Sequence, residues 1–326
     1  LLVWVWLNAS SIHLFSRDAL QGFADARKDA LYDFLKREDV NWRSLHFQVA
    51  RKVWQAHCLK GDEIKALVVD DSVKTRTGKS MGGVSWHFDH LTGRSVRGQQ
   101  VLTLGMATER AFLPLDQDIF ISKKQVQPQA FEDKRSMAAK RYQQAQKLTK
   151  PELLAASVKR VISHGFAADY FLADAWFGNK PTLRMTLDND LTAILRMKKD
   201  KTKYRHTTFK QGMKQEQMLT ATELFQQVVR KQWDKVPGTR YQSKSLEVGL
   251  NLKKQSTDPD HWVTVRLLFV RGANADSKPQ VGKHDWALFL STDTELSPQK
   301  ILEIYALRWG IEVYFKECKQ HLGLLK

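Results

Sequence analysis

The chain has 326 residues, of which 42% are hydrophobic and 27% charged, and its formal net charge is +17. This length and apolar content exclude a disordered chain and support either one large domain with an insertion or two domains. A charge this positive favours a polyanionic partner, most commonly nucleic acid, over the alternative of a basic soluble protein without one.

The two cysteines, Cys58 and Cys318, exclude a disulfide framework and offer no zinc-binding spacing, which fits a cytoplasmic protein. The opening LLVWVWL is too short to cross a bilayer and lacks the basic lead and cleavage site of a signal peptide, so we expect no membrane association. Because the chain starts without Met and stops inside a helical pattern, we expect both ends to be incomplete, with a truncated C-terminus.

Residues 1–62 are predicted to form a mostly helical N-terminal region. Apolar residues recur at helical spacing over 18–38, and a second helix is predicted from Trp42 to about His57. Short apolar strand patterns follow, and their short links predict an antiparallel meander. These strand patterns lie at 66–69, 83–90 and 99–108.

The next segment predicts a crossover helix followed by further strands. A helical pattern covers about 130–164, and apolar strand patterns lie at 166–174 and 191–197 with a short helix between them. The whole of 63–197 thus reads as three antiparallel strands, a helix, a parallel strand, a helix and a strand.

Residues 198–290 change character, and we interpret them as a β-rich insertion subdomain. A basic, turn-rich stretch opens the segment, and it is either a solvated surface or a contact to DNA backbone. Strand patterns follow at 245–254, 261–270 and 285–292. Ser297 and Pro298 then predict the start of a last helix within 291–326. Without the insertion, this is the order of a ribonuclease H-like α/β fold, a mixed sheet flanked by helices.

Acidic residues end two of the predicted strands. Asp70 and Asp71 follow the first strand, and Asp174 follows the fourth. In this order the two strands lie parallel and adjacent, so their carboxyl ends meet where ligands bind in open α/β sheets. Glu312 on the last helix is a candidate third acid. Carboxylates this close need cations between them, and hard oxygen ligands suit Mg²⁺ or Mn²⁺.

Two such ions, about 3.5–4 Å apart, activate an attacking water or sugar hydroxyl and stabilise the leaving oxygen of a phosphodiester. The last helix supports this interpretation through YALRWGIEVYFKECK, residues 305–319. At about 100° per residue, four of its polar side chains fall on one stripe. They are Tyr305, Arg308, Glu312 and Lys319.

On that stripe Glu312 would hold metal, while the bases and the tyrosine would hold the phosphates that flank the reacting bond. The alternative is a solvated helix face on which Arg308 and Glu312 form an i,i+4 ion pair. Trp309, beside the stripe, is expected to pack the helix against its neighbours.

The segment at 305–319 matches Y-x2-R-x3-E-x6-K and so resembles the signature of IS4-type insertion-sequence transposases, which carry an Asp-Asp-Glu catalytic triad. VVDDS is similar to the first-aspartate strand of that family, FLADAWFG is similar to its second-aspartate region, and a β insertion before the last acid is typical of it. Carried over by position, the triad and metal ligands would be Asp71, Asp174 and Glu312. Asp71 is preferred to Asp70 because the residue followed by Ser72 matches the pattern.

The resemblance implies a DNA transposase that cleaves at transposon ends and transfers the strand into target DNA. In this family the Tyr and Arg of the signature bind phosphate near the transposon end, where a base is flipped, and an insertion Trp stacks on that base. DWALFLST resembles that segment and nominates Trp286. The DNA-binding residues would be Tyr305, Arg308, Lys319 and Trp286.

The resemblance further implies Mg²⁺ or Mn²⁺ as a pair of ions, a homodimer in the active complex, and a location in the bacterial cytoplasm at the nucleoid. Two alternatives stay open. One is a ribonuclease H-like nuclease without strand transfer, and the other is a decayed or domesticated transposase that only binds DNA. Trp286 is alternatively a core residue.

Overall fold

The computed structural model describes residues 12–18, 20–22, 27–78, 81–89, 93–123, 130–272 and 285–321. The opening LLVWVWL and the last residue of the strand pattern at 83–90 therefore lie outside the described residues. None of the described helices is long and apolar enough to cross a membrane.

The N-terminal region is helical, as predicted. Its helices are α2 (Ile12–Asp18), α3 (Lys28–Lys36) and α4 (Trp42–Ala56). The strands of the next part are β1 (Ala66–Thr75), β2 (Ser85–Asp89), β3 (Arg94–Ala107), β4 (Phe112–Phe120), β5 (Tyr170–Ala173) and β6 (Thr192–Arg196). Its helices are α5 (Met137–Lys147), α6 (Lys150–Ser163) and α7 (Lys180–Leu187).

The rest of the chain is β-rich and ends in helices. Its strands are β7 (Lys203–Lys210), β8 (Met213–Thr220), β9 (Asp234–Lys235), β10 (Tyr241–Asn251), β11 (Trp262–Gly272) and β12 (Trp286–Ser291). Its helices are α8 (Ala221–Leu224), α9 (Pro298–Ala306) and α10 (Trp309–Gln320). The predicted start of the last helix is confirmed, since the Ser297 side chain caps α9 by accepting from the backbone N–H of Lys300 at 3.2 Å.

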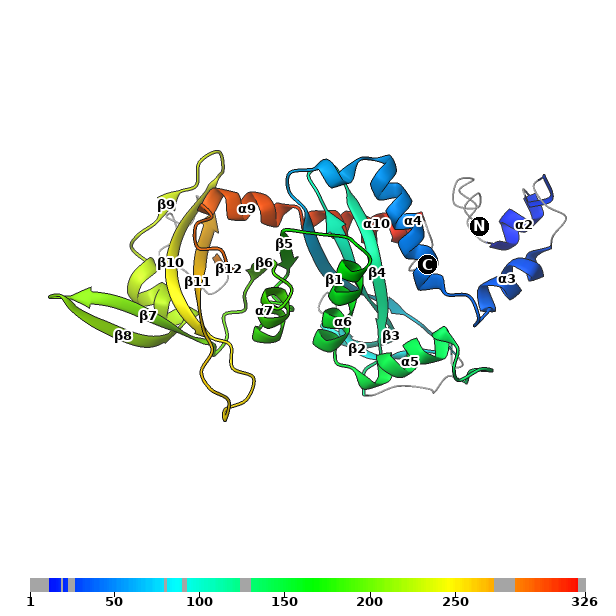
Figure 1. Ribbon diagram of the computed structural model, residues 1–326, viewed down its shortest axis with the longest axis horizontal. Coiled ribbons are helices and arrows are strands. Elements are labelled where there is room, and N and C mark those ends of the chain that lie inside the picture. The colour runs from blue at the N-terminus through cyan, green and yellow to red at the C-terminus, as the bar shows by residue number, and fades with distance from the viewer. Residues whose placement is uncertain are drawn as a thin grey trace.

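All strands join one mixed, mostly antiparallel sheet of twelve strands within the described part of the chain. β3 pairs antiparallel with β1, β2 and β4, while β1, β5 and β6 are parallel neighbours. The crossover and the parallel strand beside the first strand are therefore found. The predicted meander is wrong in its pairing, because β1 pairs with β3 and not with β2, so β3 lies between them. The β-rich segment continues the same sheet, because β12 pairs with β6 and is followed by β11, β10, β7 and β8 (Figure 1).

Helices cover both faces of β1, and this explains its continuous apolar run. Leu67 and Val69 pack with residues of α4 and α6, whereas Ala66 and Val68 pack with residues of α9 and α10. Figure 1 shows α4 and α6 beside the strands on one side and α9 running into α10 on the other. The face on which a β1 side chain lies therefore decides which helices it meets.

Several elements differ from the prediction. The strand β4 was not predicted, because Pro114 interrupts its apolar pattern. The stretch read as basic and turn-rich forms the hairpin β7–β8, closed by Gln211 and Gly212 with φ of 52° and 77°. Two successive positive φ values fit the tight turn that such a hairpin needs. The predicted stripe helix is divided, with Tyr305 on α9 and Glu312 on α10.

A buried ion cluster fastens the helices onto β4. Asp116 accepts from Arg43 of α4 at 2.8 Å and from Arg160 of α6 at 2.6 Å. Asp118 accepts from the same two guanidinium groups. Both carboxylates are almost fully buried, so each depends on these partners for its charge to be tolerated.

We predict that Asp116→Asn lowers the free energy of unfolding by about 3–5 kcal/mol, because it leaves two partly buried guanidinium groups with one carboxylate. Denaturant unfolding monitored by circular dichroism measures this loss. Glu216→Gln is the matched control, because it breaks an exposed ion pair with Lys214 and is expected to leave the free energy of unfolding nearly unchanged. Equal losses in the two variants would contradict the role given to the cluster.

Candidate active site

A cleft of about 1120 Å³ lies where β1 runs past the end of β5. The acids nominated from the sequence all line it, as does Lys319 of α10. Those acids are Asp70, Asp71, Asp174 and Glu312. Three segments far apart in the chain thus contribute carboxylates to one cleft.

Asp70 and Asp71 lie on opposite faces of β1, because successive strand residues alternate. Asp70 shares a face with Val68 and so lies on the side of α10, whereas Asp71 shares a face with Val69 and lies on the side of α6. The two neighbouring acids therefore meet different partners, and only Asp70 lies on the side of Glu312.

Asp71 is already paired with a fixed cation. Its Oδ2 accepts from Lys150 Nζ at 2.8 Å, and its Oδ1 accepts from Gln100 Nε2 at 2.7 Å. The Lys150 ammonium also lies over the ring of Trp176, 4.2 Å from its centroid. Lys150 is the first residue of α6, which the Thr149–Glu152 capping box holds in place.

Asp70 has an unusual carboxyl group. Partial burial, and to a lesser degree the charges of Asp174 and Asp71, raise the pKa of Asp70 to about 7. The backbone N–H of Asp71 donates to its Oδ1 at 2.8 Å, and Arg308 Nη1 lies 3.7 Å from its Oδ2, which oppose that rise. The positive charge near Asp70 is therefore too small to keep the pKa of this carboxyl at its usual value.

Asp174 ends β5 in a fixed turn. Its Oδ1 accepts the backbone N–H of Trp176 at 2.9 Å and that of Phe177 at 3.3 Å. Gly178 closes the turn against β6, since a Cβ there would lie 2.1 Å from the carbonyl oxygen of Arg196. The sequence AWFG after Asp174 thus positions this acid through backbone contacts.

Arg308 bridges Asp70 and Glu312. One of its amino groups donates to Glu312 Oε1, and the other lies 3.7 Å from Asp70 Oδ2. Its Nε is buried without a hydrogen-bond partner among the described residues. The i,i+4 ion pair considered from the sequence is therefore present, but it faces the carboxylates of β1 and not bulk solvent.

The donor chemistry of this cleft fits a divalent cation. Asp70, Asp174 and Glu312 offer hard oxygen ligands, and among the described residues the ion pairs of these three acids are all with Arg308. In the described residues no three acidic, histidine or cysteine side chains are close enough to form a ready metal site. Glu312 must therefore turn away from Arg308 before all three acids can bind one ion.

Tyr305 and Trp286, which the sequence nominated for DNA binding, both pack against aromatic rings of the protein. Tyr305 packs edge-on against Phe289, 4.8 Å between ring centroids, and Arg308 lies over its ring at 5.7 Å. Trp286 is a correction: it is 6% exposed, stacks on Phe225 at 4.5 Å and does not line the cleft. Because no face of a core ring is open to a base, the core interpretation of Trp286 holds.

Trp309 is a second correction, since it is 63% exposed and packs little of its ring against neighbours.

Lys150, Gln100 and Trp176 were not singled out from the sequence. No spacing could have found them, because they reach the cleft from α6, from β3 and from the turn after β5.

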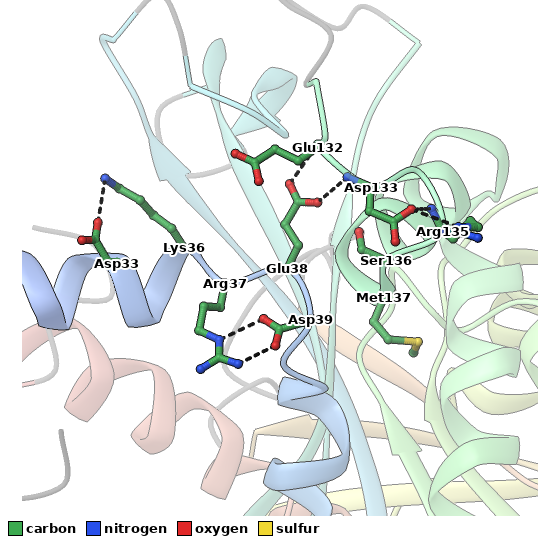
Figure 2. A pocket seen from close by; sticks show the side chains of 10 residues that line it. All are labelled: Asp33, Lys36, Arg37, Glu38, Asp39, Glu132, Asp133, Arg135, Ser136 and Met137. Carbon is green, nitrogen blue, oxygen red and sulfur yellow. Dashed lines mark hydrogen bonds and ion pairs between the residues drawn. The ribbon is translucent and has the colours of Figure 1, made fainter.

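Another pocket, of about 690 Å³, lies between the α3–α4 link and the start of α5 (Figure 2). There Glu38 accepts the backbone N–H groups of Glu132 and Asp133 at 3.3 and 3.2 Å. Charged side chains that line this pocket pair with one another, as Arg37 does with Asp39. Its polar groups hold two segments together, so it is not a candidate reaction centre.

We predict that Asp70→Asn stabilises the metal-free protein at neutral pH. The pKa of Asp70 is raised in the folded state from about 4 in the unfolded chain, so folding favours the protonated form and stability falls as pH rises from about 4 to about 7. The Tm gain of the variant should therefore be larger at pH 8 than at pH 5, in thermal melts with a chelator. Adding Mg²⁺ or Mn²⁺ at pH 8 should raise the Tm of the wild type more than that of the variant.

Asp71→Asn is the matched comparison, because it removes a neighbouring carboxylate that is already paired with Lys150. We expect it to lower the Tm at both pH values. The same sign of change in both variants would contradict the different surroundings described for the two acids.

Comparison with known proteins assigns a family. The family model described as DDE superfamily endonuclease matches residues 15–237, which include β1, β5 and both of their acidic ends. No curated protein matches the sequence. Among solved structures, the NurA nuclease from Sulfolobus solfataricus is similar at 12% sequence identity, covering 86% of this chain and 85% of that chain, with a TM-score of 0.30. A TM-score this low does not establish a shared fold.

Proposed function

This chain belongs to the DDE superfamily endonucleases, and we propose that within this family it is a DNA transposase of the IS4 type. A nuclease domain acts on DNA, and the net charge of +17 suits that polyanion. The proposed activity is metal-dependent cleavage at transposon ends followed by strand transfer into target DNA. A homodimer on the DNA, in the bacterial cytoplasm, is part of the proposal.

The observation that carries this proposal is the single cleft that gathers acids from β1, the end of β5 and α10. The parallel order β1–β5–β6, with β3 antiparallel on the other side of β1, supports a ribonuclease H-like core completed by α10. The four-position signature over residues 305–319 supports the finer assignment to the IS4 type.

We assign Asp70, in place of Asp71, as the first acid of the triad, together with Asp174 and Glu312. Asp70 lies on the α10 face and lacks a dedicated cation, whereas Asp71 is held by Lys150. These three carboxylates would hold the divalent ions, proposed as a pair of Mg²⁺ or Mn²⁺. When bound, the ions would activate the attacking water or 3′-hydroxyl and stabilise the leaving oxygen.

The protein groups around the acids bind and orient the DNA. Arg308 holds Glu312 and Asp70 together before DNA arrives, and its guanidinium suits a non-bridging phosphate oxygen once Glu312 turns to its own ligand role. Lys319 lines the cleft two turns further along α10 and neutralises a neighbouring phosphate. Each reaction is then an in-line displacement at phosphorus in which one P–O bond forms as another breaks.

We predict that Glu312→Gln and Asp70→Asn each lower cleavage of end-containing DNA at least about 100-fold, because each removes a metal-binding oxygen. Gel assays with Mg²⁺ or Mn²⁺ measure the rate. Glu317→Gln is the control on the same helix: Glu317 is exposed and pairs only with His321 among the described residues, and full activity is expected. Cleavage that survives Glu312→Gln would contradict the proposal. Cleavage lost in Asp71→Asn but kept in Asp70→Asn would reverse the choice of first acid.

The family description favours a second candidate, a ribonuclease H-like nuclease without strand transfer. We predict that a duplex with a pre-cleaved 3′-hydroxyl end becomes joined to target DNA when wild-type protein and Mg²⁺ are present. Sequencing of the joined products measures transfer, and the same duplex with a 3′-deoxy end is the control. Efficient cleavage without any joined product would favour the second candidate.

A further inference from the structure

Arg308 lies between two of the carboxylates that are proposed to bind metal. One of its amino groups donates to Glu312, and the other lies 3.7 Å from Asp70 Oδ2. We propose that Arg308 is a positioning residue that keeps the metal site unassembled until a phosphate group of DNA binds its guanidinium. This inference rests on the proposed function and names how that same site is regulated.

The backbone that carries Glu312 is held against β4. The hydroxyl of Tyr314 accepts a hydrogen bond from Gln117 Nε2 at 2.6 Å. Gly310 lies against the same strand, since a Cβ there would lie 3.0 Å from the Cβ of Phe112. The start of α10 is therefore fixed, and Glu312 reaches a metal ion by rotation of its side chain, which is 35% exposed.

Arg308 and a divalent ion compete for the same oxygen atoms. Within the described residues, Glu312 and Asp70 both have Arg308 as their ion-pair partner. A cation held between the two acids also repels the guanidinium, and this repulsion is strong in a partly buried site. Metal binding thus requires that Arg308 leave Glu312, and the apparent affinity for metal falls by the fraction of molecules in which it has left.

The guanidinium of Arg308 has an edge that a phosphate satisfies better than Glu312 does. Its Nε is buried without a hydrogen-bond partner among the described residues, and an unpaired buried donor is costly. Nε and Nη2 share one edge of the planar group, and Nη2 is the atom that donates to Glu312. A phosphate that binds this edge with two oxygens pairs Nε and releases the carboxylate.

DNA and metal therefore favour each other's binding. The phosphate that takes the guanidinium frees Glu312 to turn toward Asp70 and Asp174 as a metal ligand. Linkage requires that the metal raise the affinity for DNA by the same factor by which DNA raises the affinity for the metal. The metal site is then assembled on DNA and stays closed in the free protein.

Binding of Mn²⁺ in the absence of DNA tests the contact without any reaction, with the free ion measured by electron paramagnetic resonance. Arg308→Gln should bind Mn²⁺ about 5- to 150-fold more tightly than the wild type, the usual range of coupling between sites. Lys316→Gln is the matched control. Lys316 is exposed, lines the same cleft and follows Glu312 by four residues, just as Arg308 precedes it by four. This control removes the same charge, and a much smaller change is expected.

Arg308→Lys separates the charge from the two-pronged contact. Lysine keeps the positive charge but lacks the planar fork that reaches two carboxylates, so this variant should also bind Mn²⁺ more tightly than the wild type. A gain in affinity cannot come from a variant that has lost its fold. The proposal is overturned if Arg308→Lys matches the wild type, or if Arg308→Gln gains no more than Lys316→Gln.

Addition of a short mixed-sequence duplex tests the part played by phosphate. After subtraction of the Mn²⁺ that the duplex binds by itself, the wild type and Lys316→Gln should gain affinity for Mn²⁺, and Arg308→Gln should gain much less. No gain in the wild type, or an equal gain in Arg308→Gln, would overturn the link through Arg308. A wild type that binds no Mn²⁺ with or without DNA would instead overturn the proposed function.

Discussion

The alternation of side chains along β1 is the constraint on which the site depends. β1 runs past the end of β5, so its carboxyl half has an open edge at the cleft while helices pack on both of its faces. Two consecutive acids at this point must face different helices. One meets Lys150 at the start of α6, and the other faces Arg308 and Glu312 at the start of α10. The chemistry of each acid follows from its side of the strand.

Much of the framework could be predicted from the sequence because it depends on local signals. The buried run before Asp70, the cap at Ser297 and the order of strands and helices all follow from apolar pattern and capping chemistry, and the structure has them. β4 and the β7–β8 hairpin were missed for local reasons as well. Pro114 interrupts one pattern, and the other is a polar ribbon whose strands are exposed along most of their length.

The choice of Asp70 over Asp71 that we propose could not be made from sequence in the same way. A motif gives the position of a residue along the chain. It does not show which helix covers the face of the strand on which that residue lies. Trp286 shows the same limit. An aromatic residue in a strand pattern is equally compatible with the core and with an exposed position. Here Trp286 on β12 is buried, whereas the exposed rings that line the cleft belong to β2.

The acids of the cleft stand out in a chain whose net charge is +17. Elsewhere, buried carboxylates such as Asp116 are matched by guanidinium groups at hydrogen-bonding distance. At the cleft the compensation is incomplete: Arg308 is shared between two acids, and the pKa of Asp70 is raised. A fold that had only to be stable could add a second arginine there, as it does at β4. Leaving that charge unmatched costs stability, and a cation from solution would restore the balance, which fits the metal-dependent reaction proposed for this cleft.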